Sequence, residues 1–160
     1  MEATVAGRGS GAARGRGHGA AARAVPPAEM RRVLGEVLEA AEVDDKSSTL
    51  IRAAAPRLRI EVTDAAIVLN IAPSEKPGRT LRWRFDDEVD WEPRLRIWMD
   101  SATANRYLQG RESLAIAIAR GRVRSDGDAR TALLYLPAMR FLIEPYRRLI
   151  RERFPDLEVD

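Results

Sequence analysis

Residues 95–136 read LRIWMDSATANRYLQGRESLAIAIARGRVRSDGDARTALLYL, and the hydrophobic pattern changes its period several times within this stretch. Its first residues alternate apolar Leu95, Ile97 and Met99 with other side chains, which predicts a β-strand with one apolar face. Asp100 is a suitable N-cap, and the helical pattern that follows it ends at Gly110. The stretch therefore begins with a strand that leads directly into a capped helix.

The second half of the stretch predicts a short helix, a strand and another helix. Ser113 precedes a short predicted helical run over residues 114–120, which is apolar except for Arg120 and which Gly121 closes. Because this run is apolar on nearly every side, it predicts a fully buried helix. Residues 122–125 predict a brief strand and residues 126–127 a turn. Asp128 then caps a helix that carries leucines, namely Leu133, Leu134 and Leu136.

The residues before this stretch predict two helices and three further strands. An amphipathic helix follows Pro26-Pro27 and covers about 28–42, and a shorter helix covers about 48–55. The period then falls to two over residues 57–62, 67–71 and 81–85. Four such strands with short connections predict an antiparallel meander. The predicted fold class is α+β, with a five-stranded, mostly antiparallel sheet and helices packed on its apolar face.

The composition excludes several classes of site. The chain of 160 residues has no cysteine, and its single histidine is His18. Residues 25–160 therefore lack the usual thiolate and imidazole ligands and the usual general base, which argues against zinc, haem and a hydrolytic triad. The acidic loop 86–90 lacks the spacing and the glycine of an EF-hand, so we interpret it as a solvated loop. We expect no cofactor, no metal and no catalytic residue.

The net charge of +3 belongs to the N-terminal residues, because residues 1–24 contain four arginines and one glutamate. These residues are rich in alanine and glycine and predict a disordered tail. Arginine–glycine tails contact RNA phosphates, but this one has no interleaved aromatic residues, so a nucleic-acid partner is not expected. We divide the chain into a tail (1–25), a domain (26–152) and a C-terminal tail (153–160). With no signal-peptide pattern and no apolar run long enough to span a bilayer, we expect a cytoplasmic protein.

The order and spacing of these features resemble the sterol-carrier-protein type-2 domain family. The likeness rests on the strand 95–99, the Asp100 cap, Gly110, the short helix 114–119 and the segment 121–128, and it extends over about 28–140. Ser125 departs from the family, which usually has an apolar residue there, and the extension after Ala138 is longer than in short members. The resemblance implies an apolar tunnel between sheet and helices that holds a hydrophobic small molecule, such as a fatty acyl chain, a sterol, an isoprenoid or a quinone.

The resemblance also suggests which residues line that tunnel, although side chains of these types also occur in an ordinary hydrophobic core. The candidates are large apolar side chains from the sheet and the helices: Leu69, Trp83, Phe85, Ile97, Met99, Leu108, Leu114, Ile118, Leu133, Leu136, Met139 and Phe141. Two functions remain open: non-catalytic lipid binding or transfer, and presentation of a quinone or isoprenoid precursor to biosynthetic enzymes.

The outward face of the predicted sheet carries a second candidate site. It would gather Arg59, Arg82, Arg84, Arg94 and Arg96 into a basic stripe. Such a stripe is suited to docking on an anionic membrane or on a partner enzyme, whereas cross-strand pairing with Glu61 and other acids is the simpler reading. Trp98 lies on the same face, and we expect the helix 28–42 or a partner chain to cover it.

Overall fold

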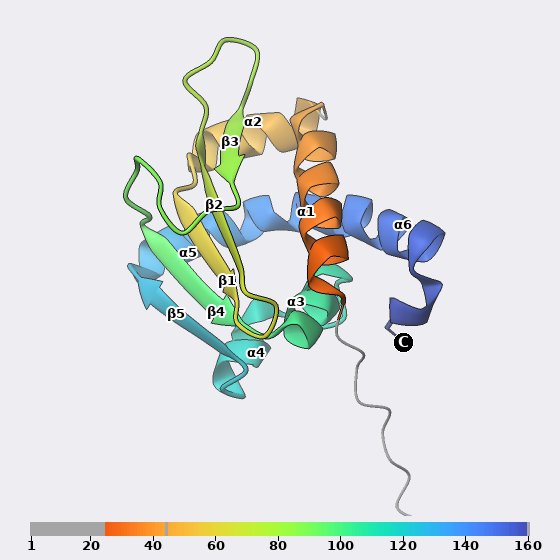
Figure 1. Ribbon diagram of the computed structural model, residues 1–160. Coiled ribbons are helices and arrows are strands. Elements are labelled where there is room, and N and C mark those ends of the chain that lie inside the picture. The colour runs from red at the N-terminus through yellow and green to blue at the C-terminus, as the bar shows by residue number, and fades with distance from the viewer. Residues whose placement is uncertain (1–24, 44, 160) are drawn as a thin grey trace, which may run out of the picture.

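The computed structural model describes residues 25–43 and 45–159, with only the backbone described at residues 45, 129 and 136. It has six α-helices, two short 3-10 helices and five strands within those residues (Figure 1). In chain order the elements are α1 (Pro27–Glu42), α2 (Asp45–Ala54), β1 (Leu58–Val62), β2 (Ile67–Pro73), β3 (Leu81–Arg84), β4 (Leu95–Met99), α3 (Ser101–Leu108), α4 (Leu114–Ala119), β5 (Val123–Gly127), α5 (Ala129–Met139), η1 (Arg140–Leu142), α6 (Ile143–Arg153) and η2 (Pro155–Leu157). Of the predicted tail 1–25, residues 1–24 lie outside the described residues, whereas Val25 is described and is buried in the core.

The strands form one five-stranded sheet in the order β3-β2-β1-β4-β5. All neighbours are antiparallel except β1 and β4, which run parallel with Leu58 beside Leu95 and Val62 beside Met99. The predicted mostly antiparallel α+β sheet is therefore confirmed, but the predicted meander is wrong. The reason is that residues 85–94 carry the chain from β3, at one edge, past β2 and β1 to the opposite side of β1.

This β3–β4 connection crosses the outward face of the sheet and is held there by side chains of the strands. Asn70 of β2 is fully buried and donates through Nδ2 to the carbonyl of Asp86 at 2.7 Å. Arg59 of β1 donates through Nη1 to the carbonyl of Asp87 at 2.7 Å. Trp91 is only 7% exposed, and the guanidinium of Arg82 lies 4.5 Å from its ring centroid. The connection therefore covers part of the face that the sequence pattern left open to solvent.

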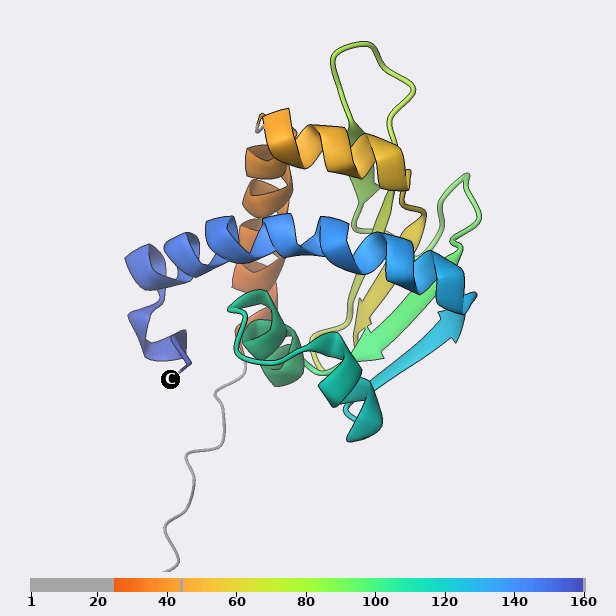
Figure 2. The ribbon, with the colours of Figure 1, turned by 180° about the vertical axis from the view of Figure 1, so that it is seen from behind.

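The helices cover the apolar face of the sheet. Seen from behind, α5 and α6 run as a nearly continuous rod whose α5 end lies in front of the strands, with α3 and α4 below it (Figure 2). The core joins buried side chains of α1, such as Met30 and Val37, to inward-facing strand residues such as Leu58 and Ile97. Trp98 lies on the opposite face from α1, so the expected cover by that helix is wrong; instead the Arg124 guanidinium lies 5.6 Å from its ring centroid.

Helix α1 also closes the edge of the sheet at β3. The carboxylate of Glu42, whose side chain is 6% exposed, accepts hydrogen bonds from the backbone N–H groups of Thr80 (3.0 Å) and Leu81 (2.5 Å). At the other end of the strand, Arg31 donates to the carbonyl of Phe85 at 2.6 Å. Because these polar groups occupy part of the strand edge, α1 limits further strand pairing there.

The predicted helix caps are present, whereas the predicted burial of α4 is wrong. Asp100 accepts from the N–H of Thr103 at 2.6 Å, and Ser113 accepts from the N–H of Ile116 at 3.2 Å. Within α4 only Leu114 and Ala117 are buried, while Ile116 and Ile118 are 47% and 42% exposed. A six-residue helix shows only one face to the sheet, so an all-apolar composition does not bury its other side.

The residues after α6, which the sequence assigns to a tail, pack against α3 through a buried polar cluster. Asn105 Oδ1 accepts from Tyr146 Oη (2.9 Å) and from Gln109 Nε2 (2.8 Å). The carbonyl of Leu157 accepts from Asn105 Nδ2 (2.9 Å) and from Gln109 Nε2 (2.8 Å). Gln109 Oε1 in turn accepts from the N–H of Val159 at 2.9 Å. The packed structure therefore continues to residue 159.

An ion pair joins α1 and α6. Arg153 of α6 donates through both terminal nitrogens to Glu36 of α1, with one contact at 2.8 Å. This hydrogen-bonded guanidinium holds the pKa of the Glu36 carboxyl below its ordinary value. Among the described residues, no helix is both long enough and apolar enough to cross a membrane.

Candidate functional site

An apolar cavity lies between the sheet and the helices. It has a volume of about 30 Å³ and is walled by α1, by the inward faces of β1, β2 and β4, by α3 and by the α5–η1 junction. Its lining residues are Leu34, Val37, Leu38, Ile60, Val62, Leu69, Met99, Ala104, Tyr107, Leu108, Met139 and Leu142. A second cavity of about 30 Å³ shares Leu38, Met139 and Leu142 with the first and extends toward α2 and Tyr135. The two cavities thus lie on either side of a wall formed by three side chains.

Both cavities are small. A site for one ordered water needs at least about 10–15 Å³, so each cavity has room for about two waters. Sites for drug-sized ligands measure roughly 300–1,000 Å³. Because the lining is almost entirely apolar, the cavities offer water few hydrogen bonds. A lipid chain would enter this space only after side chains or helices of the lining move apart.

Tyr107 supplies the one hydroxyl among the side chains that line the first cavity. It is 7% exposed, and its hydroxyl makes no hydrogen bond to another described residue. Burial raises the pKa of Tyr107 to about 12, while the positive charge of Arg140 acts in the opposite direction. Arg140 follows Met139 of the cavity wall and is itself exposed. This part of the cavity wall therefore combines a hydroxyl group with a nearby cation.

The structure brings four of the predicted lining residues together at the first cavity: Leu69, Met99, Leu108 and Met139. The others lie elsewhere. Ile97 and Leu114 are buried in the core, Trp83, Phe85 and Phe141 are half-buried, and Ile118 and Leu133 are exposed. The side chain of Leu136 lies outside the described residues.

Sequence reasoning missed most of the wall that the helices supply. Leu34, Val37 and Leu38 of α1 line the cavity, as do Ala104 and Tyr107 of α3. Their helical spacing identified them as a buried face but did not show which element that face meets. Only the inward positions of Leu69 on β2 and Met99 on β4, the two strands that flank β1, gave a usable signal for the sheet side of the cavity.

The arginines of the predicted basic stripe do lie on the outward face, but most are engaged within the domain. Arg59 pairs with Glu61 at 2.7 Å, and Arg96 pairs with Glu92 at 3.3 Å. Arg82 lies against Trp91 and reaches Asp90 at 3.6 Å. In the described part of the chain, the side chains of Arg84 and Arg94 alone of the five make no ion pair or hydrogen bond.

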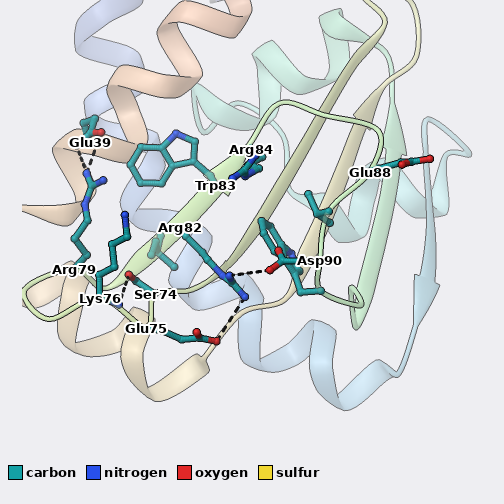
Figure 3. A pocket seen from close by; sticks show the side chains of 13 residues that line it. Glu39, Ser74, Glu75, Lys76, Arg79, Arg82, Trp83, Arg84, Glu88 and Asp90 are labelled. Carbon is teal, nitrogen blue, oxygen red and sulfur yellow. Dashed lines mark hydrogen bonds and ion pairs between the residues drawn. The ribbon is translucent and has the colours of Figure 1, made fainter.

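An open polar groove of about 750 Å³ surrounds β3 (Figure 3). Arg82 reaches from the strand toward Glu75 and Asp90 on one side, and Arg79 pairs with Glu39 on the other at 2.8 Å. Its basic and acidic side chains are equal in number. The described residues hold no cluster of three side chains that could bind a metal. The groove therefore has no excess of charge to select an ionic ligand.

Comparison with known proteins adds evidence on the fold. No family model and no curated protein matches the sequence. Among solved structures, the chain is similar to a stereoselective inverting sec-alkylsulfatase from Pseudomonas sp., with a TM-score of 0.48 and 14% identity. That match covers 57% of this chain but only 14% of the sulfatase.

Two smaller proteins match over most of their length. The UbiJ-SCP2 ubiquinone synthesis protein has a TM-score of 0.51 and 18% identity, over 72% of this chain and 89% of that protein. The sterol carrier protein domain 2 of Helicoverpa armigera has a TM-score of 0.51 and 13% identity, over 71% of this chain and 87% of that domain. The chain therefore has the fold of the sterol carrier protein 2 domains.

Proposed function

We propose that this protein binds or transfers a hydrophobic molecule without chemically changing it. The observation that carries the proposal is the cavity between sheet and helices, whose walls are apolar apart from one tyrosine hydroxyl. The likeness to sterol carrier protein 2 domains supports the same conclusion. The ligand class is a fatty acyl chain, a sterol-like molecule or an isoprenoid lipid, and the site lies between α1, the sheet, α3 and the α5–η1 junction.

The energetics favour a flexible apolar ligand. Each methylene that leaves water stabilises the complex by about 0.8 kcal/mol, so a long chain needs few polar contacts. Part of this gain is needed to separate the side chains that now close the cavity. Leu38, Met139 and Leu142 form the wall between the two cavities, so their displacement would join the cavities into one longer space. Methionine, with its unbranched and adaptable side chain, is well suited to such a position.

The first test asks whether the purified protein holds a lipid. Native mass spectrometry of protein from an expression host should show an added mass, and solvent extraction should release a lipid. A fluorescent fatty acid should gain intensity with the protein and should be displaced by unlabelled oleate. A protein that carries no lipid and leaves the fluorescent fatty acid unchanged would rule the proposal out.

A matched pair of α3 variants places the ligand. Ala104 lines the cavity and is 4% exposed, whereas Ala102 lies on the same helix, is half-buried and does not line the cavity. Ala104→Leu should fill the cavity and weaken fatty-acid binding, while Ala102→Leu should bind like the unmodified protein. Circular dichroism confirms that both variants are folded. Equal weakening in both variants, or in neither, would place the ligand elsewhere.

A second candidate function is suggested by the likeness to the UbiJ-SCP2 ubiquinone synthesis protein. In this second function, this protein would present a quinone or isoprenoid precursor to biosynthetic enzymes. Arg84 and Arg94 lie on the outward face, and their exposed side chains make no ion pair or hydrogen bond with another described residue, so they are candidate docking residues for such a partner. Two results would favour this function over general lipid transfer. Lipid extracts of the protein would be dominated by prenylated quinone precursors, and biosynthetic enzymes would co-purify with the unmodified protein but not with the Arg84→Glu and Arg94→Glu variants.

A further inference from the structure

Helix α5 exposes two adjacent large apolar side chains. Leu133 is 71% exposed and Leu134 is 61% exposed, and Pro137 lies exposed on the same helix. The opposite face of α5 is buried through Tyr135, Ala138 and Met139. The exposed leucines therefore do not result from a helix that is loosely attached to the domain. Helix α5 carries apolar residues on its outer face as well as on its buried face.

Tyr135 fixes the orientation of this helix. Its hydroxyl accepts a hydrogen bond from the backbone N–H of Arg57 at 3.0 Å, at the start of β1. With Tyr135 held toward the sheet, Leu133 and Leu134 on the other side of the helix must face outward. Figure 2 shows α5 in front of the strands, on the side where no other helix lies over it.

The charges around α5 favour an anionic partner. Residues 111–153 contain ten arginines and five acidic residues, although residues 25–160 as a whole are neutral. Arg130 in the first turn of α5 and Arg140 immediately after it are both exposed, and neither forms an ion pair with another described residue. The two leucines thus lie between two free cations. Apolar residues beside arginines are typical of helices that lie in the interfacial region of a membrane.

The same helix forms part of the wall of the apolar cavity. Met139, its last residue, lines both cavities, and Tyr135 and Ala138 line the second. Pro137 lacks an N–H group, so the helical hydrogen bond to the carbonyl of Leu133 is missing. The exposed leucines are thus joined to the cavity by a helix that is weakened between them and the wall.

We propose that α5 docks on an anionic lipid surface through Leu133 and Leu134, with Arg130 and Arg140 contacting the lipid headgroups. This inference rests on the proposed function, because a carrier that takes up and releases a lipid has to meet a membrane. The patch is small for a stable protein interface, which needs about 800 Å² on each partner. A lipid surface requires no such area, since it accepts a few inserted side chains beside headgroup contacts.

Sedimentation with vesicles tests the docking. The full chain should sediment with vesicles of phosphatidylcholine and phosphatidylglycerol, and less with phosphatidylcholine alone. Leu133→Ser combined with Leu134→Ser should lower the partition coefficient roughly tenfold or more, because two large apolar side chains no longer insert. Leu50→Ser is the matched control, since Leu50 is 48% exposed on α2, and it should sediment like the unmodified protein. Arg130→Gln with Arg140→Gln should weaken sedimentation with the anionic vesicles only.

Each other outcome overturns the docking. Equal sedimentation of all variants would place vesicle binding elsewhere in the chain. If the unmodified protein did not sediment with vesicles, the protein would not dock on a lipid surface at all. A change from dimer to monomer in the leucine variant would make the patch an interface between two copies. Binding of the fluorescent fatty acid without vesicles separates this proposal from the proposed function: a protein that binds the fatty acid but no vesicle retains the function and loses only the docking.

Discussion

The buried cluster around Asn105 offers a quantitative test of how the C-terminal residues are attached. Asn105 is 1% exposed and joins Tyr146, Gln109 and the carbonyl of Leu157 by three hydrogen bonds. In Asn105→Leu, Gln109 and the Leu157 carbonyl still bond to each other at 2.8 Å. The hydroxyl of Tyr146, which is 0% exposed, would instead be left buried without a partner.

The magnitudes follow from which groups stay paired. Losing two bonds whose other partners each keep one hydrogen bond costs about 1 kcal/mol each, and the unpaired hydroxyl costs about 1–3 kcal/mol more. We therefore expect Asn105→Leu to lower the free energy of unfolding by about 3–5 kcal/mol. Tyr146→Phe should cost only about 1 kcal/mol, since Asn105 still accepts from Gln109. In the double variant the unpaired hydroxyl is gone, so the loss of unfolding free energy should be about 2–4 kcal/mol less than the sum of the two single losses.

Urea unfolding of the four proteins, followed by circular dichroism, measures these free energies. The slope against urea should be the same in all four, which shows that the same surface is exposed on unfolding. Additive costs in the double variant would refute the reasoning, because they would mean that Tyr146 does not depend on Asn105. A cost above about 3 kcal/mol for Tyr146→Phe alone would refute it as well.

Three further predictions concern other parts of the fold. Because burial raises the pKa of Tyr107 from 10 to about 12, its neutral form stabilises the fold fully below pH 10 and this contribution is lost between pH 10 and 12. Unfolding free energies in that range should fall more steeply for the unmodified protein than for Tyr107→Phe, and parallel curves would contradict this. Gly127→Ala should melt at a lower temperature than Gly78→Ala. Both glycines have a positive φ, but a Cβ at Gly127 would lie 2.4 Å from the backbone oxygen of Arg94, whereas a Cβ at Gly78 would meet nothing within 4 Å. Glu42→Ala should lower the free energy of unfolding by about 2 kcal/mol and promote aggregation, because it uncovers two N–H groups at the β3 edge. Glu39→Ala, which removes only an exposed ion pair, should lower it by less than about 1 kcal/mol. Similar urea midpoints and similar turbidity for the two variants would disprove the protective role of Glu42.

The local elements of this fold could be predicted because their signals lie close together in the sequence. The predicted helix over about 28–42 is observed as Pro27–Glu42. The caps at Asp100, Ser113 and Asp128 all accept the expected backbone hydrogen bonds. Gly110 and Gly121 adopt φ values of +72° and +70°, as helix-terminating glycines do.

The arrangement of these elements could not be predicted in the same way. Alternation in β1 and β4 shows that each has an apolar face, but it does not show that the two are neighbours or that they run parallel. The connection over residues 85–94 looks like an ordinary acidic loop, and Trp91 within it gives no sign that it will be buried against the outward face. Such features depend on pairs of residues that are distant in the sequence.

The candidate site was predictable on the strand side and not on the helix side. Leu69 and Met99 follow directly from alternation, whereas the positions of Leu133 and Ile118 depend on which side of a short helix meets the sheet. An apolar helix gives no sequence signal for that choice when nearly all of its faces are apolar. The exposed side of α5 is therefore visible only once the position of Tyr135 is known.

The strand order has a consequence for the rate at which the protein folds. Leu58 of β1 pairs with Ile71 on one side, at short sequence separation, and with Leu95 on the other, at a much longer one. The β1–β2 hairpin should form early, and the second edge of β1 stays open until residues 85–94 have crossed the sheet. During that interval the open edge can pair with other chains. Variants that loosen the connection, such as Trp91→Ala, should refold slowly and aggregate at high protein concentration.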